Sequence, residues 1–284
     1  MPILVATDRE VVIIDIERGA SAPARGIGGR PTCLAVDALV HGRAWCGTHK
    51  GGVFRSDDGG RSWQPVGLAD RLIMAVTASP VERDTIWAGT EPSEVWRSGD
   101  AGNTWEQTSR LETLPSSSRW SFPPRPDTHH VRWIACHPLE PDRLWVAIEA
   151  GALVSTIDRG RTWRDRVPGG PRDTHELAIH RKAPDTLRVA AGDGYFESDD
   201  AGMTWRSRQP AKRPGGIRDS EFEFRPTPCI LTRRYVLQSR VPVRIPRPAQ
   251  AGNRRSEPAV LNDAYVLQLE GVGGQVIDCL NRSA

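Results

Sequence analysis

One eight-residue pattern occurs four times in the chain, and this repetition narrows the possible folds more than any other property. Each copy has the order hydroxyl, any residue, Asp, any residue, Gly, any residue, hydroxyl, Trp. The four copies are Ser56–Trp63, Ser98–Trp105, Thr156–Trp163 and Ser198–Trp205. Asp can accept hydrogen bonds from the N–H groups of a turn, Gly tolerates a positive φ, and Trp offers a large apolar surface. The pattern therefore predicts four similar turns, each followed by a strand, which we call the repeat turns.

Each repeat turn lies within a longer unit that has the same organisation. The tryptophans of successive turns are 42, 58 and 42 residues apart, and each unit contains short runs rich in β-branched and aromatic residues. The units span residues 31–67, 72–109, 131–167 and 174–208. We expect four strands in each, the last beginning at the Trp, as in Trp163–Val167. Four-stranded units at this period are typical of a β-propeller.

The eight-residue pattern resembles the Asp-box, or BNR repeat, of sialidases, sortilin-type receptors, some endoglucanases and photosystem II assembly factors. The resemblance covers about residues 30–208 and implies an all-β propeller of four-stranded blades with Asp-box turns. It implies structural roles for Asp58, Gly60, Trp63, Asp100, Gly102, Trp105, Asp158, Gly160, Trp163, Asp200, Gly202 and Trp205. We expect each Asp to fasten a hairpin, because a carboxylate repeated in every blade cannot form four copies of one active site.

The two ends of the chain lack the pattern. Residues 1–30 contain two apolar runs, which we interpret as part of a closing blade completed by a strand from the far end. Residues 209–284 have eight prolines and no Trp, and residues 206–284 carry 14 Lys or Arg against 7 Asp or Glu. This tail forms either divergent closing blades or a non-native end, such as a frame-shifted reading. The abrupt change in composition favours the second, and the number of blades stays open.

Residues 110–130 form an insertion between the second and third units. In a propeller, such a link and the loops between second and third strands open on one face, the channel mouth, and the repeat turns lie on the opposite face. The insertion contains the run Phe122-Pro-Pro-Arg125-Pro, which fits a binding loop and a rigid connector equally well.

The residues expected at the mouth suggest a recognition surface. The candidate binding residues are His49, Arg71, Trp120, Phe122, Arg125, His129, His130 and Arg132. The favoured function is a non-enzymatic scaffold that binds a protein or carbohydrate partner, centred on residues 119–132. A scaffold of this kind predicts an exposed aromatic patch around Trp120 and Phe122.

The alternative is a glycoside hydrolase of sialidase-like or endoglucanase-like architecture. Such enzymes use two carboxylates, one to donate a proton and one as base or nucleophile. The candidates are Glu149, Asp193 and Glu91, which come from equivalent loops of three units. This function predicts two carboxylates that face each other in an open pocket.

Other classes are disfavoured by composition. No apolar run approaches a membrane span, and the first residues do not resemble a secretory signal, so we expect a cytoplasmic protein without a membrane partner. The five cysteines show no C-x-x-C spacing, and His129 and His130 point apart on an extended chain, so we expect no metal or cofactor. Nucleic acid is an unlikely partner, because residues 1–205 are net acidic and the basic surplus lies in the tail.

Overall fold

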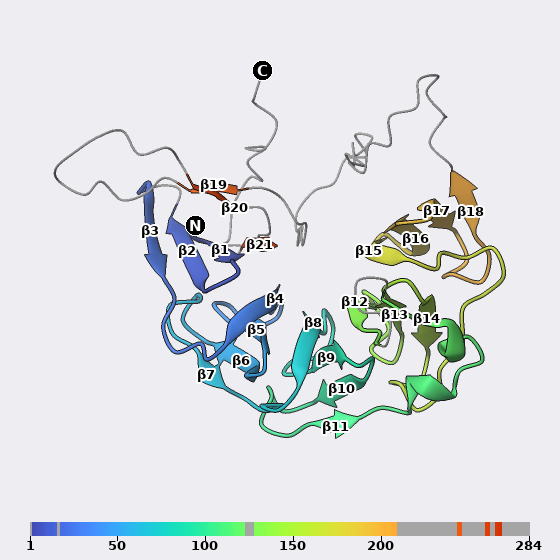
Figure 1. Cartoon of the computed structure of the whole chain (residues 1–284), viewed down its shortest axis with the longest axis horizontal. Coiled ribbons are helices and arrows are strands. Elements are labelled where there is room, and N and C mark those ends of the chain that lie inside the picture. Colours follow the sequence, from blue (N-terminus) through green and yellow to red (C-terminus); the bar gives the residue numbers. More distant parts are fainter. Residues whose placement is uncertain are drawn as a thin grey trace, which may run out of the picture.

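The computed structural model describes residues 2–15, 18–122, 128–208, 243–245, 259–261 and 265–268. Within these residues the regular structure consists of β-strands and two short 3-10 turns, η1 (Leu111–Thr113) and η2 (Ser117–Arg119). Five antiparallel sheets follow one another round an arc in chain order (Figure 1).

The sheets have one plan. The first has the order β21-β1-β2-β3, with β1 (Pro2–Ala6), β2 (Val11–Asp15), β3 (Ala20–Pro23) and β21 (Tyr265–Gln268). The second contains β4 (Arg30–Val36), β5 (Ala44–His49), β6 (Gly52–Ser56) and β7 (Gln64–Pro65). The third contains β8 (Leu72–Ala78), β9 (Ile86–Glu91), β10 (Val95–Ser98) and β11 (Glu106–Gln107). The fourth contains β12 (Val131–Cys136), β13 (Leu144–Ile148) and β14 (Ala152–Thr156). The fifth contains β15 (Thr174–His180), β16 (Ala183–Ala191), β17 (Gly194–Ser198) and β18 (Arg206–Arg208). A separate pair joins β19 (Val243–Ile245) to β20 (Ala259–Leu261).

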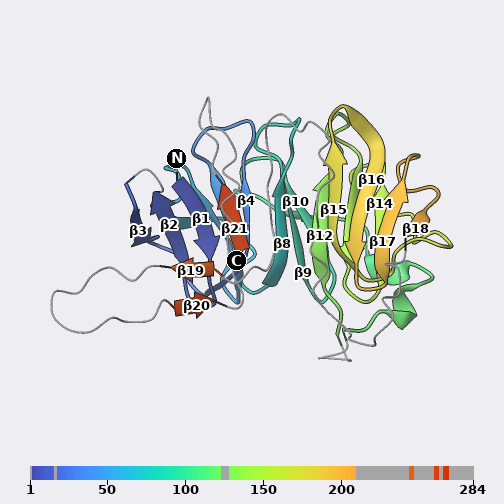
Figure 2. The same ribbon diagram turned by 90° about the horizontal axis from the view of Figure 1, so that it is seen from above.

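The sheets are arranged as the blades of a propeller. The first strands β4, β8, β12 and β15 lie innermost, and successive ones contact each other, as Figure 2 shows from above. Each later strand lies further from the centre of the arc (Figure 1). The predicted all-β propeller of four-stranded blades is confirmed.

The first sheet joins distant parts of the chain. Strand β21 pairs antiparallel with β1, in a register that places Gln268 opposite Ile3 and Tyr265 opposite Ala6. The N-terminal strands thus share a sheet with a segment from far along the sequence. Most of residues 209–284 lies outside the described residues, and so do the predictions made for that tail.

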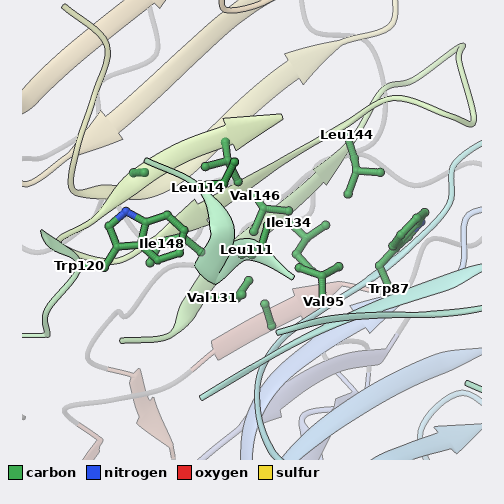
Figure 3. Packing of buried hydrophobic residues seen from close by; sticks show 13 residues of the cluster. Trp87, Val95, Leu111, Leu114, Trp120, Val131, Ile134, Leu144, Val146 and Ile148 are labelled. Carbon is green, nitrogen blue, oxygen red and sulfur yellow. The ribbon is translucent and has the colours of Figure 1, made fainter. Parts of the chain in front are cut away.

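Hydrophobic cores fill the spaces between neighbouring sheets. Figure 3 shows the core between the third and fourth sheets, where Trp87 and Val95 meet Leu144 and Val146. Alternation along each strand directs these side chains to one face of the sheet. Burying a residue of this size contributes about 1.5–3 kcal/mol, so the blades are stabilised mainly by contact with each other.

The repeat turns are held by their aspartates, as the pattern predicts. The carboxylate of Asp100 accepts hydrogen bonds from the Thr104 N–H at 2.8 Å, the Thr104 hydroxyl at 2.7 Å and the Ser98 hydroxyl at 2.8 Å. The Ser98 hydroxyl in turn accepts the Gly102 N–H at 2.8 Å, and Gly102 has a φ of +88°. The other three turns repeat this network around Asp58, Asp158 and Asp200. Hydrogen bonds from Thr104 lower the pKa of Asp100 to about 2, so the carboxylate is a structural anion.

Two of the repeat-turn tryptophans connect consecutive sheets, whereas the indole N–H of Trp63 donates to the carbonyl of Gly60 within its own turn at 2.8 Å. The indole N–H of Trp105, in the third sheet, donates to the carbonyl of Val66 beside the second sheet at 2.7 Å. The indole N–H of Trp163 donates to the carbonyl of Ser109 beside the third sheet at 3.1 Å. Each of these two half-buried rings therefore lies against the outer part of the preceding blade, where its N–H finds a backbone acceptor.

One predicted strand is wrong. The segment Trp163–Val167 forms only a single bridge, in which Arg164 pairs with Ser155. The next residue, Asp165, accepts hydrogen bonds from the Ser116 N–H at 2.7 Å and the Ser116 hydroxyl at 2.5 Å. The insertion therefore engages this edge of the fourth sheet, and Pro168 has no N–H with which to extend the ladder.

Candidate functional site

The candidate residues that the structure describes lie at one end of the blades, which we call the mouth face. It carries the loops that follow β5, β9, β13 and β16, and the links into β8, β12 and β15. The repeat turns lie at the other end, because they pair with the loops between first and second strands. In the third sheet, for example, the N–H of Ala101 donates to the carbonyl of Asp84 at 2.8 Å.

A buried histidine gathers two of the predicted carboxylates. His130 precedes β12 and is only 1% exposed. Its Nε2 lies 2.7 Å from Oε2 of Glu149, and its Nδ1 lies 3.8 Å from Oε2 of Glu91. Arg132 adds a positive charge, with its Nε 3.8 Å from Oε2 of Glu149. Links and loops of two neighbouring blades thus meet on His130.

The surroundings of Glu149 keep it ionised. Burial would raise the pKa of this carboxyl, but the hydrogen bond with His130 and the charge of Arg132 outweigh burial and lower it. Glu149 is consequently suited to act as a base or as a fixed negative charge, and unsuited to donate a proton at neutral pH.

Asp193 belongs to a different group of residues. Its carboxylate accepts backbone N–H groups from Arg172 at 3.2 Å and from Asp173 at 3.3 Å. The Arg172 guanidinium also approaches it, at 3.8 Å. Asp193 therefore fastens the link into β15 to the loop after β16.

Glu176 was not among the predicted carboxylates. It lies on the inner strand β15, and burial raises the pKa of its carboxyl, while Arg132 acts in the opposite direction. Glu149 and Glu176 thus both interact with Arg132, and their environments shift their pKa values in opposite directions. Acid–base enzymes use carboxylates that differ in this way. The predicted candidates came from loops, whereas Glu176 lies within strand β15. The direction of its side chain, which the sequence does not give, is the signal that would have identified it as a candidate.

A third group has donors that suit a cation. One ligand atom each of Glu149, Asp173 and His175 lie within 4.8 Å of one another. The hydrogen bond with His175 is the main cause that lowers the pKa of Asp173. These ligand types suit a divalent metal, yet Glu149 is already engaged by His130 and faces Arg132. The prediction overlooked this group because its members come from two blades.

The predicted aromatic patch is wrong at Trp120. This side chain is 6% exposed and packs in the core with Leu111 and Leu114 of the insertion (Figure 3). Its indole N–H donates to the hydroxyl of Ser116 at 2.9 Å. The insertion is built around an apolar anchor, so its tryptophan is used for packing and is not available to a ligand.

The other binding candidates are dispersed. The ring of His129 stands edge-on to Trp120, with centroids 5.5 Å apart, and the half-buried Phe122 ring does the same to His130 at 4.9 Å. Arg71 pairs with Glu94 at 3.1 Å on the mouth face of the third sheet. The remaining candidates are His49, which ends β5 and is partly buried, and Arg125, which lies outside the described residues.

A groove runs between the fourth and fifth sheets on the mouth face. A cavity of about 680 Å³ and a neighbouring one of about 340 Å³ share the same central lining. That shared lining consists of Ser116, Arg119, Arg166, Arg172 and Asp193. The groove combines open space with three arginines. The insertion supplies Arg119, which was not among the predicted binding residues.

Comparisons with known proteins support the fold. No protein-family model matches the chain, and no curated protein matches it. The GH74 xyloglucanase of Xanthomonas campestris matches with a TM-score of 0.57 at 16% identity, over 75% of this chain and 37% of that one. An ancestral GH74 enzyme matches with a TM-score of 0.51 at 17% identity, over 67% and 25%. A chain of a nidogen/laminin complex matches with a TM-score of 0.54 at 10% identity, over 74% and 78%.

These likenesses establish a β-propeller and leave its activity open. Identities of 10–17% show the fold alone. The chain spans between a quarter and two-fifths of the length of the two GH74 chains. Among the described residues, no helix is long and apolar enough to cross a membrane.

Proposed function

We propose that this protein is a non-enzymatic recognition scaffold, a propeller of the Asp-box type that binds a protein or carbohydrate partner on its mouth face. The groove between the fourth and fifth sheets carries the proposal. There, open volume coincides with polar side chains from several elements, and placed polar groups are what fix the orientation of a ligand in a concave site.

The predicted catalytic carboxylates support this proposal through their interactions. Glu149 is hydrogen-bonded to His130 and lies 3.8 Å from Arg132, and Asp193 is occupied by two backbone N–H groups. Groups held in this way stabilise the loops around the groove. The nidogen/laminin match is, by its name, a protein complex, so a fold of this kind can serve protein recognition.

One observation favours a hydrolase as a second candidate. Glu149 and Glu176 both interact with Arg132, and their pKa values shift in opposite directions. A glycoside hydrolase needs this division between a base and a proton donor. The GH74 matches share the fold, and one of them is described as a xyloglucanase.

Two measurements test these functions against each other. Hydrolysis of a panel of β-glucans, xyloglucan and sialosides should be absent in the wild type and in Glu149→Gln and Glu176→Gln alike. If the wild type hydrolyses one of these substrates and either substitution abolishes that activity, the protein is a hydrolase and the scaffold function is refuted.

The second measurement compares captured partners. Tagged wild type should retain a set of proteins or glycans. The Arg166→Glu variant, altered on the mouth face, should lose them, and the Arg83→Glu variant, altered on the opposite face, should keep them. Identical partner lists for all three forms would refute recognition at the mouth face. Both arginines are outside the catalytic candidates, so the pair is a fair comparison.

A further inference from the structure

We propose that the groove between the fourth and fifth sheets binds an acidic peptide segment of a protein partner through Arg119, Arg166 and Arg172. This inference rests on the proposed scaffold function and specifies the chemistry of its partner. The proposed site shares Arg119 with the predicted centre at residues 119–132 and extends from it to the link into β15.

The three arginines reach the groove from three separate elements. Arg119 ends the turn η2 of the insertion, Arg166 follows the bridge at the edge of the fourth sheet, and Arg172 lies in the link into β15. All three line both cavities. A guanidinium group presents a planar fork of N–H donors that matches the two oxygens of a carboxylate.

The acidic side chains of the groove are occupied elsewhere. Asp165 accepts the N–H and hydroxyl of Ser116, and Asp173 accepts the N–H of Ala150 at 2.8 Å. Asp193 accepts the N–H groups of Arg172 and Asp173. These contacts hold the three aspartates against the protein backbone or a buried serine, and among them Asp193 also approaches the Arg172 guanidinium, at 3.8 Å.

The guanidinium groups are correspondingly available. Within the part of the chain that the structure describes, Arg119 and Arg166 form no ion pair, and the contact of Arg172 with Asp193 is long, at 3.8 Å. Arg119 and Arg172 are exposed, and Arg166 is half-buried. A carboxylate from outside would supply the acceptors that the described residues leave unused.

The shape and lining favour a peptide over a small anion. The larger cavity alone, of about 680 Å³, far exceeds the space of one phosphate, and a second cavity adjoins it. Its walls include Pro115, Val167 and Pro168, which offer apolar surface to the methylene groups of side chains. Several carboxylates along one chain could engage arginines that lie on different elements.

The same lining disfavours a sugar chain. Carbohydrate sites stack aromatic rings on sugar faces, and Phe196 is the only aromatic residue of the described lining. Phe196 is 5% exposed and packs with Trp145 and Leu187 in the core between the fourth and fifth sheets. Trp120 is likewise buried in the neighbouring core.

Fluorescence polarisation with defined peptides tests the proposal on the full chain. The probe is a fluorescein-labelled dodecapeptide of alternating Glu and Gly, and the matched probe has Gln in place of Glu. We expect the wild type to bind the Glu peptide and not the Gln peptide, with affinity that falls as salt rises.

Two triple variants separate the groove from general basicity. Arg119→Gln, Arg166→Gln and Arg172→Gln together should weaken binding of the Glu peptide about tenfold or more, since three charge-assisted contacts are lost. Arg83→Gln, Arg161→Gln and Arg181→Gln together remove the same charge from exposed arginines at the opposite end of the blades and should leave affinity within about twofold. Unchanged circular dichroism and urea midpoint establish that both variants fold.

Other results would overturn the proposal. Equal weakening by both triple variants would show nonspecific attraction, and equal binding of the Gln peptide would show that charge is not recognised. Full competition by millimolar inorganic phosphate would identify a small-anion site, and stronger competition by an oligogalacturonate would identify an acidic sugar. The peptide assay tests only this inference, whereas the scaffold function is tested by partner capture with Arg166→Glu. A negative peptide result together with capture that depends on Arg166 would refute this inference and leave the scaffold function standing.

Discussion

Replacement of Trp120 by Ala should release the insertion from the blade on which it lies. The ring is 6% exposed, and an indole of this kind buries about 200 Å² of surface. At about 25 cal/mol per Å² the transfer contribution is at most about 5 kcal/mol. Substitutions of buried Trp by Ala cost about 3–5 kcal/mol, so the two figures agree. The hydroxyl of Ser116 also loses the indole N–H that it accepts.

The effect should be concentrated in one segment, and hydrogen exchange measured by mass spectrometry can locate it. A loss of about 3 kcal/mol accelerates exchange through local opening about a hundredfold or more. We expect this acceleration in peptides from residues 110–122 and not in peptides from residues 44–56, which belong to the second sheet. The Trp120→Phe variant keeps most of the buried ring and should show a much smaller change.

Opposite behaviour would refute the reasoning. If Trp120→Ala exchanged like the wild type over residues 110–122, the ring could not be the anchor that its burial implies. If the variant also lost its partners without any loss of protection against exchange, Trp120 would have the ligand-binding role that its burial argues against.

Three further predictions follow from the turns and from the buried histidine. Asp158 has a pKa of about 2, below the value near 4 of an unfolded Asp, so its contribution to stability is fully present above pH 4 and is lost as the pH falls from 4 through 2; Asp158→Asn should lower the urea midpoint at pH 7 by much more than it does near pH 2. Gly102→Ala combines a φ of +88° with a Cβ 2.9 Å from a side chain of the preceding sheet and should cost about 1–3 kcal/mol in the free energy of unfolding. Gly169→Ala, with a φ of +77° and open space, should cost less, and equal losses would contradict the clash. Glu149→Ala removes the partner of His130 Nε2 and should cost about 1–3 kcal/mol, measured by urea unfolding, and a neutral result would show that His130 finds another acceptor.

The fold could be predicted from sequence because its signal is local and repeated. The network around Asp100 involves residues within six positions of each other, so all the hydrogen-bonding groups of a turn come from one short segment of sequence. Alternation along the strands then fixes which side chains meet between sheets. The strand missing after Trp163 could not be foreseen, because it depends on the contact between Asp165 and Ser116, 49 residues apart.

The site was harder to predict because it depends on distances between blades. The sequence placed His130 and Glu149 on one face, but nothing in it showed that they form a pair or that Glu176 lies near Arg132. Trp120 was misjudged for a related reason. Its position in a Pro-rich link suggested exposure, whereas its burial is decided by packing with Leu111 and Leu114, which the link itself supplies.

The indole contacts between sheets have a consequence for how damage spreads. Trp105 reaches back to Val66 and Trp163 reaches back to Ser109, so the third blade is bonded to the second and the fourth blade to the third. Structures built of such nearest-neighbour couplings behave like a row of linked units, in which a lesion weakens its own unit most and adjacent units less. Loss of one indole should therefore produce a graded profile along the arc, with the steepest change at the joint that the indole closes.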